Sequence, residues 1–450
     1  MKLTNGSTVA VVGGGPAGAF TAYFLKLFSY LVEMEIQVDI YEPKDFSQRG
    51  AKGCNHCGGV VSESLVQFMA TEGITIPPEI ITNTIDVYTL HTDSGHVALH
   101  TPFEEMRIAA IFRGGGPKQS KSVVATAPIK GLDEYLLELA CRHGANLIRE
   151  RVTNLDWDLG RPQVIVKNDR RTYDLLVGAT GINGTGIKLF ESMGWGYSPP
   201  KMSKTFIQDL YLGKEVVEKY VGNSMHVFLL NIPGINQGAI IPKGDYATFC
   251  FVAQTITNEL IEQFFSHPEV KGCLPPDWKR PANIDSCLCY PDTNVGDAIN
   301  PYTDRVVMVG DCGVARLFKD GIGSAYRMAK ACATTAVLWG ISTKDFRDHY
   351  EPVCKKISFD NRVGHLVLDA FGLARTIGFV RYGILATAAA EQRDNREKKP
   401  MSSALWSAFS GSHSYVDIFL DVLGSPLMLM RLFWNLLKGL FNAKFSCKNS

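Results

Sequence analysis

The stretch VAVVGGGPAG, residues 9–18, is an apolar segment that runs directly into a G-x-G-x-x-G motif. Gly13 permits a tight turn, Gly15 lets the backbone approach a diphosphate, and Gly18 lets the following helix pack closely against a sheet. The amino end of this helix offers unpaired N–H groups and a partial positive charge, both of which attract phosphate. The stretch therefore predicts a strand, a nucleotide-binding turn and a helix.

The next apolar segment, VDIYE at residues 38–42, ends in a carboxylate. Glu42 is placed to accept hydrogen bonds from the ribose hydroxyls of an adenosine, and its charge repels a 2′-phosphate. Pro16 and Ala17, at the start of the intervening helix, belong to the turn that receives the phosphates. Together the two segments predict a βαβ unit that binds FAD or NAD rather than NADP.

The composition is that of a globular chain with a large core. Of the 450 residues, 46% are hydrophobic and 20% are charged, which excludes wholesale disorder. Lys and Arg total 46 against 45 Asp and Glu, a formal net charge of +1. No nucleic-acid-binding module is visible, so we expect no nucleic-acid partner.

The cysteines and the amino terminus indicate a cytoplasmic setting. Eleven cysteines are scattered without the spacing of a disulfide framework, and the first strand follows the amino terminus without a signal peptide. No run reaches the roughly 18 apolar residues of a membrane-spanning helix. We therefore expect a cytoplasmic protein and leave peripheral contact with the inner face of a membrane open.

The order of the segments predicts an α/β fold. It combines a Rossmann-like nucleotide-binding domain, an inserted, mainly antiparallel β-sheet domain for substrate, and a helical carboxyl-terminal region. Alternating segments at residues 84–90 and 95–100 predict antiparallel strands, and residues 132–140 predict a helix. The predicted boundaries are residues 1–80, 120–185 and 290–340 for the nucleotide, 81–119 and 186–289 for substrate, and 341–450 for the helical region.

The segment VGDCG at residues 309–313, followed by KDGIGSA at residues 319–325, resembles the second FAD motif of the p-hydroxybenzoate hydroxylase-like flavoproteins. In that family the aspartate binds the ribityl chain, and the G-x-G brings backbone amides and a helix amino end to the isoalloxazine ring. The resemblance implies FAD contacts at Gly310, Asp311, Gly321, Ile322 and Gly323. Combined with the first motif, it favours FAD over NAD.

A third segment, TYDLLVGATG at residues 172–181, resembles the strand ending in Ala-Thr-Gly of two-dinucleotide flavoproteins. This resemblance implies a cofactor contact at Gly181. Hydroxylases of the same fold usually carry Asp-Gly at that point, and here Thr180 takes the place of the aspartate. The substitution argues against a hydroxylase.

Two short segments resemble the geranylgeranyl reductases, flavoenzymes that saturate isoprenoid double bonds with reduced FAD. Cys57-Gly58-Gly59 is similar to an element that this family places near the flavin, which implies a catalytic Cys57 and a cofactor contact at Gly58. Residues 233–245, which contain Pro-Lys-Gly, resemble the substrate-cavity segment. The aromatic residues of that family's Tyr-x-Trp-x-Phe-Pro pattern are replaced at Gln237, Ala239 and Ile241.

Cys54 and Cys57 form a C-x-x-C with three open interpretations. A redox pair beside the flavin would need lowered thiol pKa values. A zinc site would need two more ligands, for which Cys287 and Cys289 are candidates by residue type alone. The third interpretation is a glycine-rich loop with packed thiols. The sequence assigns no metal ligand.

Arg113 lies in an Arg-Gly-Gly-Gly-Pro loop, where we expect a solvated arginine in a turn. The alternative is an arginine that steers an anionic group to the active site. The triple glycine has no strand before it and no helix after it, so it is not a second nucleotide motif. No separate NAD(P)H domain is visible, and we expect transient NAD(P)H or another electron carrier as the donor.

The carboxyl-terminal segment at residues 425–442 predicts an amphipathic helix that starts at Ser425-Pro426. Polar residues recur there at helical spacing: Arg431, Asn435, Lys438 and Asn442. Such a helix suits a bilayer interface, with Trp434 at headgroup level. Burial against the enzyme or against a second subunit explains the same pattern.

Three functions follow from these motifs. The first is an FAD-dependent oxidoreductase that moves hydride equivalents to or from an apolar substrate, such as an isoprenoid lipid or a quinone. The second is an FAD-dependent monooxygenase or halogenase of the same fold. The third is a non-catalytic flavin-binding protein associated with a membrane. Use of oxygen separates the first two, and absence of turnover identifies the third.

Overall fold

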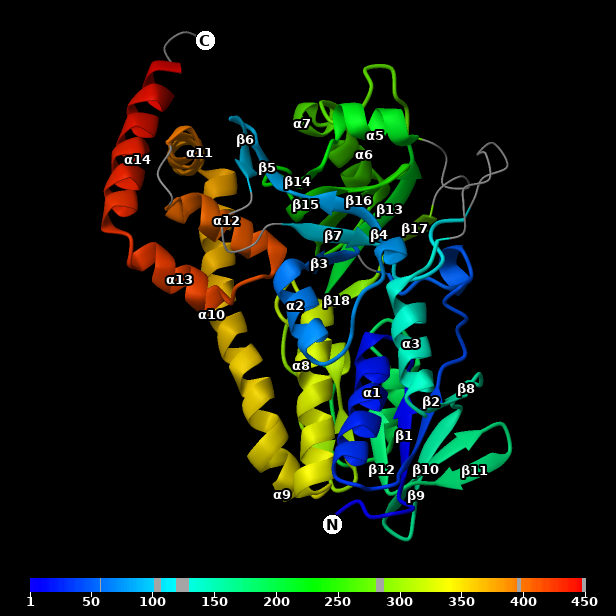
Figure 1. Ribbon diagram of the computed structural model, residues 1–450. Helices are drawn as coiled ribbons and strands as arrows, with labels where there is room; N and C mark the ends of the chain where they lie inside the picture. The colour runs from blue at the N-terminus through cyan, green and yellow to red at the C-terminus, as the bar shows by residue number, and fades with distance from the viewer. Residues whose placement is uncertain (57, 101–106, 119–128, 281–286, 395–397, 447–450) are drawn as a thin grey trace.

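The structure is a computed structural model that describes residues 1–56, 58–100, 107–118, 129–280, 287–394 and 398–446, with side chains up to residue 441. Two large sheets occupy different ends of the molecule, and a row of carboxyl-terminal helices runs along one side (Figure 1). The predicted α/β fold with parallel strands is confirmed.

The first sheet has six strands in the order β19-β20-β12-β1-β2-β8. Their bounds are Tyr302–Thr303, Val306–Met308, Leu175–Gly178, Thr8–Val12, Gln37–Tyr41 and Asn146–Ile148. All pairs are parallel except β19 with β20. Because the carboxyl ends of parallel strands meet at one edge, the segments that follow β1, β2, β12 and β20 converge there.

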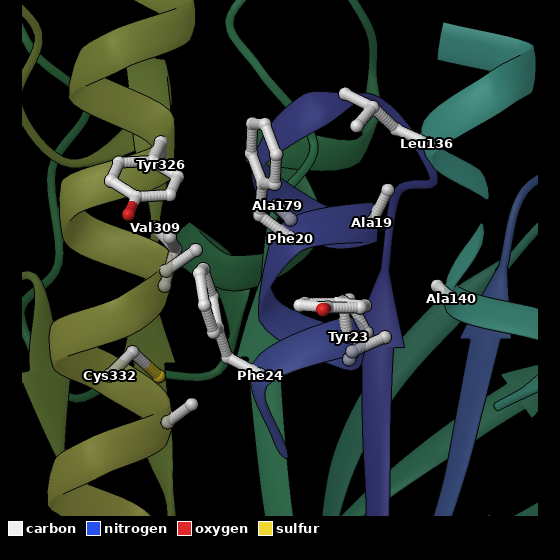
Figure 2. Close-up of a cluster of buried hydrophobic side chains, with 14 of the residues drawn as sticks. Ala19, Phe20, Tyr23, Phe24, Leu136, Ala140, Ala179, Val309, Tyr326 and Cys332 are labelled. Carbon is white, nitrogen blue, oxygen red and sulfur yellow. The ribbon is translucent and has the colours of Figure 1, made fainter. Parts of the chain in front are cut away.

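Helices α1 (Pro16–Leu31), α3 (Leu132–Arg142) and α8 (Gly321–Thr334) pack beside this sheet. Figure 2 shows Phe20 and Phe24 of α1 between Tyr326 of α8 and the side chains of α3. The Tyr326 ring lies 5.6 Å from both phenylalanine rings and meets them edge to face. This buried cluster fixes α1 and α8, and therefore fixes their amino ends at the carboxyl edge of the sheet.

The second sheet has eight strands in the order β17-β13-β16-β15-β14-β5-β6, with β18 also paired to β13. Their bounds are Cys287–Cys289, Met202–Tyr211, Tyr246–Ala253, Ile235–Lys243, Ser224–Phe228, Val87–Thr92, Gly95–His100 and Asp292–Asn294. All pairs are antiparallel except β14 with β5. Helices α5 (Lys214–Tyr220), α6 (Asn258–Ser266) and α7 (Pro268–Lys271) accompany it.

The prediction of a single strand over residues 84–90 is wrong. Strand β4 ends at Ile85 and β5 begins at Val87, and the two strands belong to different sheets. The chain changes sheets at Asp86, whose N–H donates to the carbonyl of Asn223 instead of joining either ladder. Alternation of apolar residues continues through this crossing, so the pattern alone did not reveal it.

Two smaller sheets complete the β structure. One has the order β3-β7-β4, with bounds Val60–Ser62, Ile108–Ile111 and Ile81–Ile85. The other has the order β11-β10-β9, with bounds Asp169–Thr172, Arg161–Val166 and Asn154–Asp158. Helices α2 (Glu63–Thr71) and α4 (Gly186–Ser192) lie in the connections.

The carboxyl-terminal region is helical, and its helices form one side of the molecule (Figure 1). Their bounds are Thr343–Asp345 for α9, Glu351–Thr376 for α10, Gly378–Arg393 for α11, Pro400–Ser410 for α12, Tyr415–Leu423 for α13 and Pro426–Ser446 for α14. Among the described residues no single helix meets the length and hydropathy of a membrane span; residues 343–376 and 378–393 meet them only as a pair bent by 108°.

Helix α14 starts at Pro426, as predicted. The hydroxyl of the preceding residue, Ser425, donates a hydrogen bond to the carbonyl of Asp421 in α13 at 2.7 Å. Arg431 and Asn435 of the polar stripe face inward, whereas Lys438 is exposed. Asn435 Nδ2 donates to the Thr387 hydroxyl of α11 at 3.1 Å, and Arg431 pairs with Asp394 at 3.4 Å. The Asn442 side chain lies outside the described residues.

Candidate functional site

A cavity of about 830 Å³ extends from the carboxyl edge of the six-stranded sheet to the eight-stranded sheet and the carboxyl-terminal helices. Predicted site residues line it: Gly13, Gly15, Pro16, Ala17, Glu42, Gly58, Gly181, Asp311, Gly321 and Ile322. Gly18, Gly310 and Gly323, which the sequence also predicts as cofactor contacts, are not among the residues that line it. Cys57 lies outside the described residues. Segments far apart in sequence therefore share one cavity.

The first glycine turn cannot carry side chains at two of its positions. A Cβ at Gly13 (φ +107°) would lie 2.3 Å from the Ala179 carbonyl oxygen, and one at Gly18 would lie 1.8 Å from the Gly13 carbonyl oxygen. Gly15 is the N-cap of α1, and no side chain caps the helix there. The first amides of α1 are thus left facing the cavity, where they suit an anion.

Arg113 is not a solvated turn residue. Its side chain is 14% exposed and forms a two-point ion pair with Asp133, whose side chain is fully buried. Asn55 Nδ2 also donates to the Asp133 carboxylate. The guanidinium lines the cavity, and a Cβ placed on Gly15 would lie 3.8 Å from Arg113 Nη2. The alternative role, a cation held beside an anion site, fits this position.

Glu42 lies at the end of β2, as the motif requires. Its carboxylate accepts hydrogen bonds from the backbone N–H of Gly14 and of Lys44, each at 2.8 Å. Burial raises the pKa of Glu42, although both N–H donors and the Lys44 ammonium oppose the shift. The side chain lines the cavity while the backbone holds it in place, so its predicted contact with a ribose stays available.

Gly310 and Asp311 follow β20 at the same edge. Gly310 adopts φ +79°, and a Cβ there would lie 2.7 Å from the Ala17 Cβ, so the turn must approach α1 closely. Asn294 Nδ2 donates to the Asp311 carbonyl at 2.8 Å. Burial raises the pKa of the Asp311 carboxyl, and the Arg113 charge partly opposes this. A half-buried carboxylate that lines the cavity is suited to hydroxyl donors such as those of a ribityl chain.

The turn before α8 is held in an uncommon conformation. Phe318 (φ +57°) and Asp320 (φ +50°) are both left-handed, a strain of about 1–3 kcal/mol each. Asp320 caps α8 by accepting the Gly323 N–H at 3.1 Å, and its other oxygen binds Arg316 at 3.0 Å and Arg327 at 2.8 Å. These contacts fix the amino end of α8 at the cavity.

Lys319 is a residue that the sequence did not single out. Its side chain lines the cavity, is 7% exposed, and donates to the carbonyls of Ser407 at 3.1 Å and His413 at 3.0 Å. Nζ also lies 3.8 Å from the centre of the Tyr415 ring. Burial, followed by the Arg316 charge, lowers the pKa of Lys319 to about 7. It is the first residue of the quoted segment 319–325, but that segment gives it no role, because its partners come from the carboxyl-terminal region.

The far part of the cavity is apolar. The eight-stranded sheet contributes Ile207, Met225, Val227, Ala239, Ile241 and Phe251 to its wall. The carboxyl-terminal helices contribute Leu368, Phe371, Ala408 and Phe409. Gln237, Ala239 and Ile241, the positions matched to the reductase aromatic pattern, all line this part. The helical region therefore takes part in the cavity, which its sequence did not reveal.

Burial raises the pKa of the Cys54 thiol, which is opposite to what a redox-active thiol needs. In the described part of the chain, candidate metal-ligand clusters form only around His91, and none includes Cys54, Cys287 or Cys289. His56 lines the cavity in a left-handed conformation (φ +50°), and its buried Nδ1 has no hydrogen-bond partner among the described residues. The surroundings of Cys54 thus favour a packed thiol at that position, and Cys57 lies outside the described residues.

These residues fit FAD. The uncapped amino end of α1 and Arg113 would hold the diphosphate, Glu42 the adenosine ribose, Asp311 the ribityl chain, and the amides at Gly321 and Ile322 the ring. The crowding at Gly13 and Gly310 provides the close backbone approach that such a cradle needs. The assignment of each contact is a prediction.

Comparisons with protein-family models and with curated proteins give no match. Solved structures do match. A geranylgeranyl bacteriochlorophyll reductase-like protein from Thermoplasma acidophilum has a TM-score of 0.60 at 13% identity, covering 82% of this chain and 88% of its own. The halogenase PltM in complex with phloroglucinol and FAD has a TM-score of 0.60 at 11% identity, with coverages of 94% and 96%.

A third solved structure is the p-nitrophenol 4-monooxygenase PnpA from Pseudomonas putida, with a TM-score of 0.57 at 12% identity and coverages of 92% and 100%. A reductase-like protein, a halogenase and a monooxygenase thus share this architecture across most of the chain. At such identities the likeness establishes the fold. The chain shares the fold of these solved structures, in line with the family that its sequence motifs resemble.

Proposed function

We propose that the protein is an FAD-dependent oxidoreductase that reduces an apolar substrate, an isoprenoid lipid or a quinone. One observation carries the proposal: a single cavity joins the nucleotide-binding edge of the first sheet to an apolar chamber between the second sheet and the carboxyl-terminal helices. A cofactor held at the first end would present its ring to a substrate held at the second.

When bound, FAD supplies the hydride-transfer chemistry. The chain's own residues bind and orient. The amino end of α8 lies at the cavity, where its dipole would stabilise negative charge on a bound flavin, and Asp320 holds that end in position. The apolar wall excludes water from the substrate. Lys319, whose pKa is lowered to about 7, is suited to hold or release a proton beside the cavity near neutral pH.

The second candidate is an FAD-dependent monooxygenase or halogenase. The likeness to a halogenase and to a monooxygenase supports it as directly as the likeness to the reductase-like protein supports the first. The departure at Thr180 and the apolar cavity wall favour reduction. A non-catalytic flavin protein is the third candidate.

A lipid surface is part of the proposal. Helices α13 and α14 turn large apolar side chains to the solvent, each at least 40% exposed: Phe419, Leu420, Leu423, Leu427, Met430, Phe433, Trp434, Leu440 and Phe441. The polar residues Arg431 and Asn435 instead face the protein. An outward apolar face with an exposed Lys438 suits a bilayer of anionic lipids.

The same region connects this surface to the cavity. Tyr415, the first residue of α13, lines the cavity, and Phe419 and Leu420 of the same helix are exposed. A membrane-soluble substrate would then reach the cavity without crossing water. We also propose a peripheral position on a membrane and transient NAD(P)H as the electron donor.

The test is anaerobic. Protein reconstituted with FAD is reduced chemically, mixed with a lipid extract, and the products are analysed by mass spectrometry, with a parallel sample admitted to oxygen. A gain of two hydrogens supports reduction, and a gain of oxygen or halogen supports the second candidate. Tight FAD binding with neither product identifies a non-catalytic protein. Ala239→Trp, which fills the apolar wall, should abolish product while leaving FAD binding unchanged.

A further inference from the structure

A cluster of metal-ligand side chains lies on the second sheet, apart from the cavity. It consists of His91 on β5, His226 on β14 and Cys273 just after α7. All three are buried, with exposed fractions of 5%, 8% and 2%. His91 Nε2 lies 2.8 Å from His226 Nδ1, and Cys273 Sγ lies 3.3 Å from the same Nδ1. Three donor atoms from three elements therefore meet at one point.

The outer nitrogens of both histidines are already engaged. His226 Nε2 lies 3.0 Å from the Val221 carbonyl oxygen, which only accepts, so this nitrogen carries the proton. His91 Nδ1 lies 2.6 Å from the Glu269 carboxylate, which also accepts, so Nδ1 carries the proton of the His91 ring. Neutral His91 and His226 thus turn lone pairs toward each other at 2.8 Å. Such a contact is repulsive unless a cation or an additional proton lies between them.

We propose that His91, His226 and Cys273 bind a zinc ion. Two imidazoles and one thiolate form a donor set that zinc prefers, and the contacts from Glu269 and Val221 orient each imidazole as outer partners of zinc ligands do. With metal–nitrogen distances near 2.0–2.1 Å, tetrahedral donors stand about 3.4 Å apart. The two histidine nitrogens must separate by roughly half an ångström to admit the ion. The fourth position is left for water.

The position of this cluster indicates a structural metal site and not a catalytic one. Strand alternation places His226 on the face of β14 opposite to Met225 and Val227, which line the cavity. Cys273 follows α7, so the ion would tie this helix and the end of α6 to the sheet. Binding displaces the Cys273 thiol proton to solvent, and no electron is transferred.

The experiment uses the full chain without a histidine tag. The protein is stripped with a chelator, titrated with zinc chloride, dialysed, and its metal content and melting temperature are measured. We expect about one zinc per chain and a higher melting temperature. Cobalt(II) should give the absorption of a thiolate-bound tetrahedral ion.

Matched variants assign the ligands. Cys273→Ser and His226→Gln should lose zinc, and Glu269→Gln should weaken binding by about tenfold to a hundredfold because only the outer partner changes. Cys141→Ser and the exposed His100→Gln should bind as the unaltered chain does. The proposal fails if the unaltered chain retains no zinc after titration, a result independent of whether any variant folds and of FAD binding.

Discussion

The Glu42 carboxylate accepts a hydrogen bond from the backbone N–H of Gly14, with an Oε2 to N distance of 2.8 Å. This bond joins the end of β2 to the glycine turn after β1. It positions the one acidic side chain of the motif before any nucleotide arrives, so the carboxylate is both a structural partner of the turn and a candidate ligand for a ribose.

Replacing Glu42 tests both roles. Because the folded-state pKa of Glu42 is raised by burial, the folded protein holds this proton more tightly, and stability from this group falls as the pH rises from 4.5 through the raised pKa. Glu42→Gln should remove that component from the unfolding free energy measured against pH. FAD affinity should drop about tenfold, near 1.4 kcal/mol. The exposed Glu35→Gln should change neither quantity.

Gly15→Ala should weaken FAD binding without unfolding the protein. Its Cβ would lie 3.4 Å from Asn55 Nδ2, an ordinary contact, yet it would occupy the space that a diphosphate needs. We expect at least about a tenfold loss in FAD affinity by fluorescence titration. Gly372→Ala, on α10 with nothing within 4 Å of the added Cβ, is the control and should bind FAD normally.

Arg113→Met should destabilise the protein because it leaves the buried Asp133 carboxylate without its cation. The expected loss is about 3–5 kcal/mol in chemical denaturation. Adding Asp133→Asn should recover part of the stability, since the unpaired charge is gone. FAD affinity should remain low in both variants, because the guanidinium beside Gly15 is absent; normal affinity in the double variant would contradict a role for Arg113 at the anion site.

Because of Lys319, the free energy of unfolding should depend on pH in the range above pH 7. Its pKa is lowered from 10.5 to about 7, so between these values the unfolded chain binds more protons and stability rises with pH. The slope from one such group is at most about 1.4 kcal/mol per pH unit. Lys319→Met should flatten the unfolding free energy across this window. An unchanged slope would show that the ammonium is not desolvated.

The outward face of α14 should bind lipid. Trp434→Glu combined with Phe433→Glu should reduce co-sedimentation with vesicles of mixed neutral and anionic lipids by about tenfold or more. Leu159→Glu, which alters a fully exposed leucine in the turn between β9 and β10, is the matched control and should leave sedimentation unchanged. Loss of a dimer in light scattering, with no vesicle binding by the unaltered chain, would instead assign the face to a second copy.

The sequence by itself determined the turns and strand ends at the carboxyl edge of the first sheet, where it predicts a bound nucleotide. Gly13, Gly18 and the carboxylate at Glu42 lie in short segments whose chemistry is local, because a turn, a helix amino end and a strand end each form from neighbours in the chain. The second motif, ending at Gly323, was recognisable for the same reason.

Tertiary structure alone decided what surrounds that edge. Arg113 is buried because Asp133, twenty residues later, lies beneath it. Lys319 lies against Ser407 and His413, and the proposed zinc ligands come from three elements spread over residues 91 to 273. Burial and pairing depend on which segments meet in space, and packing between distant segments leaves no periodic signal in any one of them.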